Sequence, residues 1–312
     1  MTVSASVVIP THNGGAGAVI VLRALAAGSR PRTGFELIVV DSASTEDVAE
    51  TIHQDRAWSD LSSAGVACRV VREPTPGLTT ARLRGIDEAS SDIICFLDDD
   101  TIPGKGYVEA GVAAFDDPTV GMLTSRVFPR YEVEPSAAIV KREHMLAINY
   151  RHGDRALDWG ANATVAATIG AGMWIRRQAL AAALDRRDAW LWLPDRTGTV
   201  LSSGGDIEFG VMVGAAGFRR IYVPDLRLEH CIPAGRVQMD YFKRLVASVV
   251  RSHLTLTYRY PPRPWTMRDR LRAIGRYAAA LLAAPALLLG KDGWRETSLV
   301  LTARRAAIRG PE

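Results

Sequence analysis

The feature that most constrains the fold is a regular alternation of short apolar runs and helical segments over residues 4–97. The apolar runs are rich in β-branched residues and occupy residues 4–10, 35–44, 67–73 and 92–97, as expected of buried strands. Between them, residues 19–27, 44–52 and 78–90 carry the apolar spacing of helices, the second opening on a capping-box pattern at Ser44 or Thr45 followed by Asp47. Strands that alternate with helices predict an α/β fold, with an open, mainly parallel sheet and helices on both faces.

Polar residues follow three of these strands, at the edge where such sheets bind ligands. They are residues 10–13, 41–44 and 98–100. The last group is three consecutive aspartates, Asp98, Asp99 and Asp100, directly after the apolar run IICFL. Like charges this close raise each other's pKa unless a positive charge lies among them. The sequence therefore predicts either a divalent cation at this position or a turn that points the carboxylates apart.

After Asp100 the pattern becomes irregular. We expect helices over residues 104–115 and 236–254, strands over 120–128 and 219–224, a glycine-rich turn, short strand and helix within 170–184, and a glycine-rich loop that opens a helix within 202–217. Beyond a linker at 261–265, helices are predicted over 267–290 and around 294–308. The apolar stretch 277–289 is shorter than the roughly 20 residues that span a bilayer. It suits either a buried helix or an interfacial one with Arg270, Arg272 and Arg276 at lipid headgroups.

Charge is distributed unevenly along the chain. Residues 259–312 contain 11 Lys and Arg against 4 Asp and Glu, a net of +7, which leaves −3 on residues 1–258 out of the total of +4. A basic tail suggests an anionic partner such as a membrane leaflet or a phosphate-bearing acceptor, whereas an arginine-rich solvated surface is the simpler alternative. No base-stacking or helix-turn-helix signature is present, so we expect no nucleic-acid partner.

Cysteine usage and the first residues bear on the compartment. Cys68, Cys95 and Cys231 are odd in number and far apart, which indicates reduced thiols. The opening MTVSASVVIP has neither a positive leader nor an apolar signal core. We expect a cytoplasmic protein, with peripheral contact at the inner face of the cell membrane through residues 259–312.

Taken together, several stretches resemble the family 2 glycosyltransferases, which have the GT-A fold. The matching stretches are VVIPTHN (7–13), VVDSAS (39–44), PGLTTARLRGIDEASSDIICFLDDD (76–100), GAGMWIRR (170–177), GGDIEFGVMVGAAGFRRIYVPD (204–225) and LEH (228–230). The resemblance implies transfer of a sugar from a nucleotide diphosphate donor, usually with Mg²⁺ or Mn²⁺ and with inversion at the anomeric carbon. Carboxylate oxygens at a strand end are the ligands that such hard cations prefer.

The same resemblance assigns residues to the donor and the metal. It implies that Asp100 is a metal ligand and that His230 completes the metal shell. It also implies that Asp98 contacts the ribose or base side of the nucleotide, and that Asp99 assists either Asp98 or Asp100. It further implies that Pro10, Thr11 and Asn13 form the first nucleotide loop, that Asp41 binds the base, and that Arg82 holds the base or the diphosphate. The simpler alternatives are a helix cap or solvated loop for the three aspartates, a turn for Asp41, a surface helix arginine for Arg82 and a structural role for His230.

The catalytic base and the acceptor residues are also implied by resemblance. Inverting transfer needs a base that deprotonates the acceptor hydroxyl, and Asp206 takes that position in a Gly-Gly-Asp-x-Glu stretch. The family has Glu where this chain has Gly205, a departure that leaves Asp206 without a neighbouring carboxylate along the chain. Gly172, Met173, Trp174 and Glu208 are expected on the acceptor side, although Trp174 suits a core position equally well and Glu208 suits an ordinary first-turn helix acid.

These observations predict two parts and one leading function. Residues 1–235 are expected to form the GT-A domain, with a nucleotide-binding half (1–103) and an acceptor half (104–235), and residues 236–312 a helical, basic extension. The expected enzyme is a hexosyltransferase-type transferase of cell-envelope polysaccharide biosynthesis, which moves a sugar from a UDP-sugar to a glycan or lipid-linked saccharide. The alternatives are a non-catalytic sugar-nucleotide-binding or membrane-docking scaffold and a metal-dependent nucleotidyltransferase. The latter usually has a basic, glycine-rich phosphate loop, and VVIPTHNGG has no basic lysine or arginine.

Overall fold

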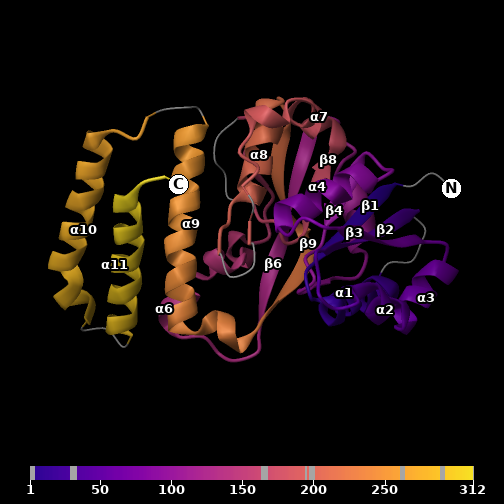
Figure 1. Ribbon diagram of the computed structural model, residues 1–312, viewed down its shortest axis with the longest axis horizontal. Coiled ribbons are helices and arrows are strands. Elements are labelled where there is room, and N and C mark those ends of the chain that lie inside the picture. Colours follow the sequence, from indigo (N-terminus) through magenta and orange to yellow (C-terminus); the bar gives the residue numbers. More distant parts are fainter. Residues whose placement is uncertain are drawn as a thin grey trace.

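A nine-stranded sheet organises the part of the chain that the structure describes (Figure 1). The computed structural model describes residues 4–28, 34–162, 168–193, 195–196, 201–260, 264–288 and 292–311. The strands are β1 (Ala5–Thr11), β2 (Phe35–Ser42), β3 (Ala67–Glu73), β4 (Ile93–Phe96), β5 (Thr101–Pro103), β6 (Val120–Tyr131), β7 (Leu157–Asp158), β8 (Met173–Arg176) and β9 (Arg219–Ile232). Their order is β3-β2-β1-β4-β8-β6-β9-β5, and β7 pairs with β9.

The N-terminal half of the sheet is parallel, as predicted. Strand β1 lies between β2 and β4 and is parallel to both, and β2 is parallel to β3. The register pairs Thr11 at the end of β1 with Asp41 near the end of β2. The polar residues that follow β1, β2 and β4 therefore lie at one edge of the sheet.

The second half of the sheet is mixed. Strand β8 is antiparallel to both β4 and β6, whereas β6 and β9 are parallel. Strand β5 is antiparallel to β9, with Thr101 opposite His230. This pairing brings the residue after the three aspartates against a strand that lies about 130 residues further along the chain, and so determines the surroundings of Asp100.

Helices cover both faces of the sheet because the strand side chains alternate in direction. They are α1 (Gly15–Gly28), α2 (Val48–His53), α3 (Arg56–Ser63), α4 (Leu78–Glu88), α5 (Tyr107–Ala113), α6 (Ala137–Val140), α7 (Arg177–Asp185) and α8 (Gly205–Ala215). On β1, Val7 and Ile9 join a core cluster that includes residues of α1, α2, α3 and α5, and Val8 joins a second cluster with α4, α7 and α8. Short 3₁₀ helices lie at Glu143–Leu146, Tyr150–His152, Arg187–Ala189 and Ala234–Val237.

One predicted helix start was wrong. Helix α2 begins at Val48, after Asp47, whose side chain accepts the Glu50 backbone N–H at 2.8 Å and so caps the helix. Ser44 and Thr45, where the sequence suggested the cap, lie in the loop after β2 and do not cap the helix. The Ser44 hydroxyl accepts the Asn13 N–H at 2.8 Å, and the Thr45 hydroxyl donates to Asn13 Oδ1 at 3.1 Å.

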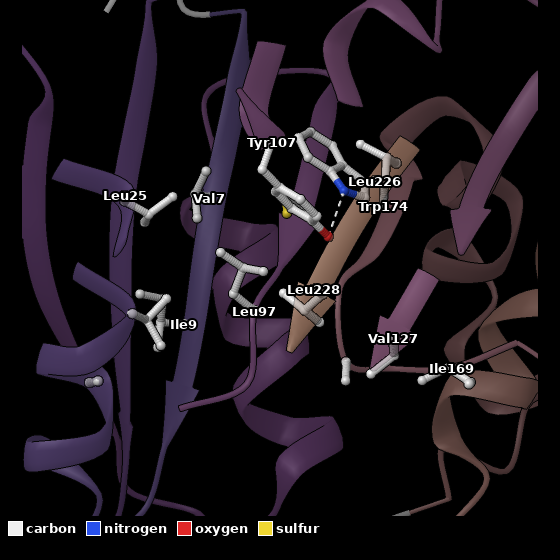
Figure 2. Packing of buried hydrophobic residues seen from close by; sticks show 14 of the residues in the cluster. Val7, Ile9, Leu25, Leu97, Tyr107, Val127, Ile169, Trp174, Leu226 and Leu228 are labelled. Carbon is white, nitrogen blue, oxygen red and sulfur yellow. Dashed lines mark hydrogen bonds between the residues drawn. The ribbon is translucent and has the colours of Figure 1, made fainter. Parts of the chain in front are cut away.

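Trp174 lies in the core rather than at the acceptor side. It is fully buried, and its Nε1 donates to the Tyr107 hydroxyl at 3.2 Å, as Figure 2 shows. That hydroxyl lies 2.5 Å from Ser125 Oγ, which donates to the Gly172 carbonyl at 2.6 Å. The expectation that Trp174 contacts an acceptor is therefore wrong, because the indole presents no face to the cavity described below.

Three long helices form a layer beside the sheet domain, on the side opposite the N-terminus (Figure 1). They are α9 (Met239–Arg259), α10 (Met267–Leu288) and α11 (Gly293–Arg309). Helix α11 contacts both α9 and α10, which leaves α10 outermost. Residues 261–263 of the predicted linker and 289–290 of the predicted helix lie outside the described residues. The division at residue 235 stays a prediction.

Candidate active site

A large cavity opens at the carboxyl ends of β1 and β4, on the side of the sheet that faces α9. Its volume is about 1130 Å³. Eight of the residues singled out in the sequence line it: Pro10, Thr11, Arg82, Asp98, Asp99, Asp100, Asp206 and His230. They come from segments up to 220 residues apart and meet because the sheet order places β9 and the start of α8 beside the parallel half.

The three aspartates after β4 point to different partners. Asp98 Oδ1 accepts from Arg82 Nη2 at 3.2 Å, Asp99 Oδ2 accepts from Thr11 Oγ1 at 2.5 Å, and Asp100 Oδ2 lies 2.9 Å from Arg236 Nη1. Burial, and then the charges of Asp100 and Asp98, raise the pKa of Asp99 to about 7. The turn therefore separates the carboxylates, and it also leaves Asp100 directed into the cavity.

Asp100 and His230 form a pair suited to a cation. His230 is 4% exposed, and its Nε2 lies 3.2 Å from both Asp100 Oδ2 and Arg236 Nη1. Burial opposes ionisation, but His230 and Arg236 hold the pKa of Asp100 well below its usual range. In the tautomer with the proton on Nε2, His230 donates to this carboxylate, and in the other neutral tautomer the same nitrogen is free to bind a cation together with Asp100.

These two residues fit the divalent cation that the resemblance implies. Within the described residues, no cluster of three or more His, Cys, Asp or Glu side chains is arranged to hold a metal. Mg²⁺ and related ions at nucleotide sites usually take only one or two protein carboxylates, with water and phosphate oxygens completing the shell. A site with two protein ligands that opens into the cavity satisfies that requirement.

Asp206 lies in the first turn of α8, and backbone donors fix its carboxylate. The Gly170 N–H donates to Oδ2 at 2.7 Å, and the Ile207 N–H donates to Oδ1 at 2.9 Å. Burial raises the pKa of Asp206, whereas the nearby Arg82 guanidinium opposes the rise. An oriented carboxylate with an elevated pKa, at the wall of a cavity, has the properties of a general base.

Arg82 connects the two sides of the cavity. Its side chain is 2% exposed, with Nη2 on Asp98 and Nη1 3.4 Å from Asp195 Oδ2. Asp206 contributes to the field that raises the pKa of Arg82 against the effect of burial. The guanidinium is therefore a fixed positive charge among three carboxylates, rather than the surface helix arginine that was the simpler alternative.

Several predicted site residues do not reach this cavity. Glu208 is 1% exposed, and its oxygens accept the Leu191 and Leu193 N–H groups at 2.8 Å each and the Tyr260 hydroxyl at 2.6 Å. Its carboxylate is fully engaged in holding a loop, so the expected acceptor contact is wrong. Met173 is fully buried in the second core cluster, and Gly172 lies against Tyr107 and Ser125 in the core. At this turn Gly170 and Ala171 line the cavity instead.

Asn13 and Asp41 also lie beside the cavity rather than on it. The backbone of Asn13 is in the left-handed region (φ 51), and its Oδ1 accepts the Thr45 N–H at 2.8 Å. Asp41 accepts the Ser44 N–H and Arg72 Nη1 at 3.0 Å each. Asp41 and Arg72 line a second, smaller cavity of about 410 Å³. The predicted contacts of Asn13 and Asp41 with the nucleotide stay predictions.

Sequence reasoning missed Asp195 and Arg196, which line the main cavity. Asp195 is 4% exposed, and burial and the charge of Asp206 raise its pKa to about 7. The segment around it has no repeating pattern and matches none of the stretches quoted above. Only a polar Asp-Arg pair after an apolar Leu-Trp-Leu run distinguishes it.

Comparison with known proteins agrees with this fold and site. The sequence model of Glycosyl transferase family 2 matches residues 6–183, and the chain belongs to this family. The pre-mycofactocin glycosyltransferase of Mycobacterium tuberculosis is 28% identical over 306 residues, which are 97% of this chain and 57% of that protein. Glycosyltransferase AglE of Haloferax volcanii is 28% identical over 123 residues, 39% of this chain and 38% of AglE. The chain thus spans about half the length, or less, of these curated relatives.

Solved structures with the same fold cover nearly the whole chain. The mannosyltransferase PcManGT from Pyrobaculum calidifontis, in complex with GDP-Man and Mn²⁺, has a TM-score of 0.61 at 20% identity, covering 98% of this chain and 87% of that one. S. aureus TarS 1–349, in complex with UDP-GlcNAc, has a TM-score of 0.52 at 14% identity, covering 97% and 90%. The predicted GT-A fold is confirmed by these likenesses. In the part of the chain that the structure describes, no helix has the length and apolar content needed to cross a bilayer.

Proposed function

We propose that this chain is an inverting glycosyltransferase that moves a sugar from a nucleotide diphosphate donor to a glycan or lipid-linked acceptor. The observation that carries the proposal is the meeting of Asp100, His230 and Asp206 at one cavity, with Arg82 between the two sides. Family membership supports the reaction class. A UDP-sugar is the expected donor, and the GDP-Man and UDP-GlcNAc bound by the two structural neighbours define the donors to test first.

Asp100 and His230 would hold Mg²⁺ or Mn²⁺, and the Mn²⁺ in the PcManGT complex supports this assignment. When bound, the cation supplies Lewis-acid stabilisation of the negative charge that develops on the diphosphate. Arg236, beside Asp100, adds a second positive charge on the same side of the cavity.

The chemical step uses Asp206 as the general base. Its carboxylate, fixed by two backbone N–H groups, takes the proton of the acceptor hydroxyl. The hydroxyl oxygen forms a bond to the anomeric carbon, and the bond from that carbon to the diphosphate oxygen breaks with its electron pair on the diphosphate. Attack from the face opposite the leaving group inverts the configuration. Arg82 orients Asp98 on the donor side through its 3.2 Å contact.

The wall of the cavity opposite the sheet supports an acceptor with an apolar part. Helices α6 and α9 contribute Val140, Val249, Val250 and Leu254 to the lining. A purely sugar acceptor would leave these side chains without apolar partners, whereas the lipid of a lipid-linked saccharide would cover them. This acceptor class supports the proposed place in cell-envelope polysaccharide biosynthesis.

Helix α10 supports peripheral contact with an anionic membrane. Met267, Leu271, Ile274, Leu281 and Leu282 are exposed, and their spacing places them along one stripe of the helix. Exposed arginines flank the stripe, among them Arg268 and Arg270. An apolar face bordered by arginines matches the interface of an anionic leaflet, and a cytoplasmic protein would meet it at the inner face of the membrane.

The decisive experiment separates catalysis from binding. We expect the wild type to release nucleoside diphosphate from one of UDP-, dTDP- or GDP-sugars in the presence of Mn²⁺, and to show a metal-dependent rise in Tm with the same nucleotide. Asp206→Asn should retain that rise and lose about 10²–10⁴-fold in kcat. Unchanged turnover in Asp206→Asn would exclude this residue as the base. Binding without turnover by the wild type would favour the scaffold alternative. Pyrophosphate release in a parallel assay, supplied with a nucleoside triphosphate and a sugar 1-phosphate instead of a nucleotide sugar, would favour a nucleotidyltransferase.

A further inference from the structure

Gly205, the residue that departs from the family pattern, lies where a side chain would meet a carboxylate from elsewhere in the chain. It is the first residue of α8 and does not have a left-handed backbone, so glycine is not required there for its conformation. A Cβ at this position would lie 2.6 Å from Asp195 Oδ2 and 2.7 Å from Thr79 Oγ1. The space that a longer side chain would use is therefore occupied by Asp195.

The Asp195 carboxylate is held directly beside the base. Its Oδ1 accepts the Gly205 N–H at 3.0 Å, and its Oδ2 lies 3.4 Å from Arg82 Nη1. It is buried and still lines the cavity that Asp206 lines. A carboxylate at the N-terminus of α8 accepts a backbone N–H that no other helical residue can satisfy.

The loop that carries Asp195 is fixed at several points. The Thr79 hydroxyl donates to the Leu193 carbonyl, and Glu208 accepts the Leu191 and Leu193 N–H groups. Asp195 itself has a left-handed backbone (φ 36), which non-glycine residues seldom adopt. A conformation that is locally unfavourable and held by its surroundings is more often found at a functional position than elsewhere.

We propose that Asp195, from this loop, supplies the carboxylate that α8 lacks because residue 205 is glycine. In that place Asp195 sets the orientation and the proton affinity of Asp206. The inference rests on the proposed function, because it assigns a partner to the proposed base. The charged groups around Asp206 are Arg82, Asp98 and Asp195. The positive charge of Arg196 also acts on Asp195 and lowers its pKa. Asp195 shares the Arg82 guanidinium, whose charge lowers the pKa of Asp206, so this contact increases the proton affinity of Asp206.

Moving the carboxylate back to the helix tests this directly. Asp195→Ala should lower kcat roughly tenfold or more, with unchanged affinity for the nucleoside diphosphate by calorimetry. Gly205→Glu alone should lower the Tm, because its side chain meets Asp195. The double variant Asp195→Ala/Gly205→Glu should have a higher Tm than Gly205→Glu and recover most of the kcat that Asp195→Ala loses.

A second variant separates tuning from structure. Asp195→Asn keeps an acceptor for the Gly205 N–H and removes the charge, so the acid limb of kcat/KM should move to lower pH while kcat falls. Asp188→Asn, at an exposed aspartate in the neighbouring 3₁₀ helix, should behave as the wild type. The proposal is overturned if Asp195→Asn keeps the wild-type kcat and pH profile, or if the double variant is no more active than Asp195→Ala. If the wild type binds nucleotide without turnover, the proposed function is rejected. The Tm difference between Gly205→Glu and the double variant would then still test the placement of Asp195.

Discussion

At the scale of single residues, Glu36 shows how a buried charge is stabilised away from the active site. It is 3% exposed, and it accepts from Ser6 Oγ and the Ser90 N–H at 2.6 Å each and from Arg69 Nη1 at 2.7 Å. Burial alone would raise its pKa, but these hydrogen bonds lower the pKa of Glu36 to about 2. Since the folded-state pKa lies below the ordinary value of 4.5, the stabilisation is present in full above that value and is lost as the pH falls towards 2.

We therefore expect Glu36→Gln to lower the free energy of unfolding by about 2–3 kcal/mol at pH 7. The difference from the wild type should shrink at pH 3, because the wild-type carboxylate is then losing its advantage. Urea denaturation at the two pH values measures both effects. Glu50→Gln, at an exposed position on α2, is the matched control. An equal loss at pH 3 and pH 7 would show that the charge of Glu36 contributes nothing.

Residues of the site differ in how far the sequence could predict them. Asp98, Asp99 and Asp100 follow a recognisable strand, and parallel strands share an edge, so their meeting with Thr11 follows from the local pattern. His230 reaches Asp100 only through the register of β5 on β9, which no local pattern specifies. Asp195 could not be predicted at all, because its role depends on the space left by Gly205 in three dimensions.

At the scale of elements, the same contrast separates the two halves of the sheet. Residues 4–97 alternate strand and helix with short connections, and right-handed crossovers leave few topologies for such a pattern. The half after Asp100 contains long β6 and β9 strands, and a short β8 that joins the two halves by antiparallel pairing. These pairings depend on long-range contacts, so the sequence predicted the existence of the strands but not their order. The buried Trp174 follows from the position of β8 at the centre of the sheet.

Two glycines in helices offer a test of element packing. Gly111 of α5 faces Trp174, and a Cβ there would come within 2.6 Å of Trp174 Cε2, whereas Gly275 of α10 has nothing within 4 Å. Alanine favours a helix by about 1 kcal/mol over glycine when space allows. We expect Gly275→Ala to raise stability by about 0.5–1 kcal/mol. Gly111→Ala should instead cost about 1–3 kcal/mol through overpacking.

Thermal denaturation of the two variants beside the wild type gives the comparison. Because the substitution is chemically the same in both helices, the difference between them reports packing rather than helix propensity. Stabilisation by Gly111→Ala would mean that α5 can move away from the sheet at little cost. The packing of Tyr107 against Trp174 in Figure 2 would then be less tight than their hydrogen bond indicates.

At the scale of the whole molecule, residues of both the sheet domain and α9 line the cavity. Helix α10 forms the outer side of the three-helix layer (Figure 1). The part of the apolar cavity wall that α9 contributes and the exposed apolar stripe of α10 thus belong to the same C-terminal layer. Helix α11 lies between α10 and α9, so the exposed stripe of α10 and the cavity are on opposite sides of this layer. The net charge of +7 over residues 259–312 would add attraction to anionic lipid.

The proposed membrane contact can be tested in the full-length chain. Leu271 and Leu282 are 60% and 84% exposed. The double variant Leu271→Glu/Leu282→Glu should therefore leave the Tm nearly unchanged, while it places two negative charges in the apolar stripe. We expect the wild type to float with vesicles rich in phosphatidylglycerol, less with phosphatidylcholine alone, and less in high salt because screening weakens attraction between exposed charges. The double variant should float several-fold less. Ile20→Glu, at a similarly exposed apolar residue on α1, is the control and should float as the wild type does. Equal flotation of the wild type and the α10 variant would remove the membrane contact from the proposal and leave α10 as the outer helix of a packed layer.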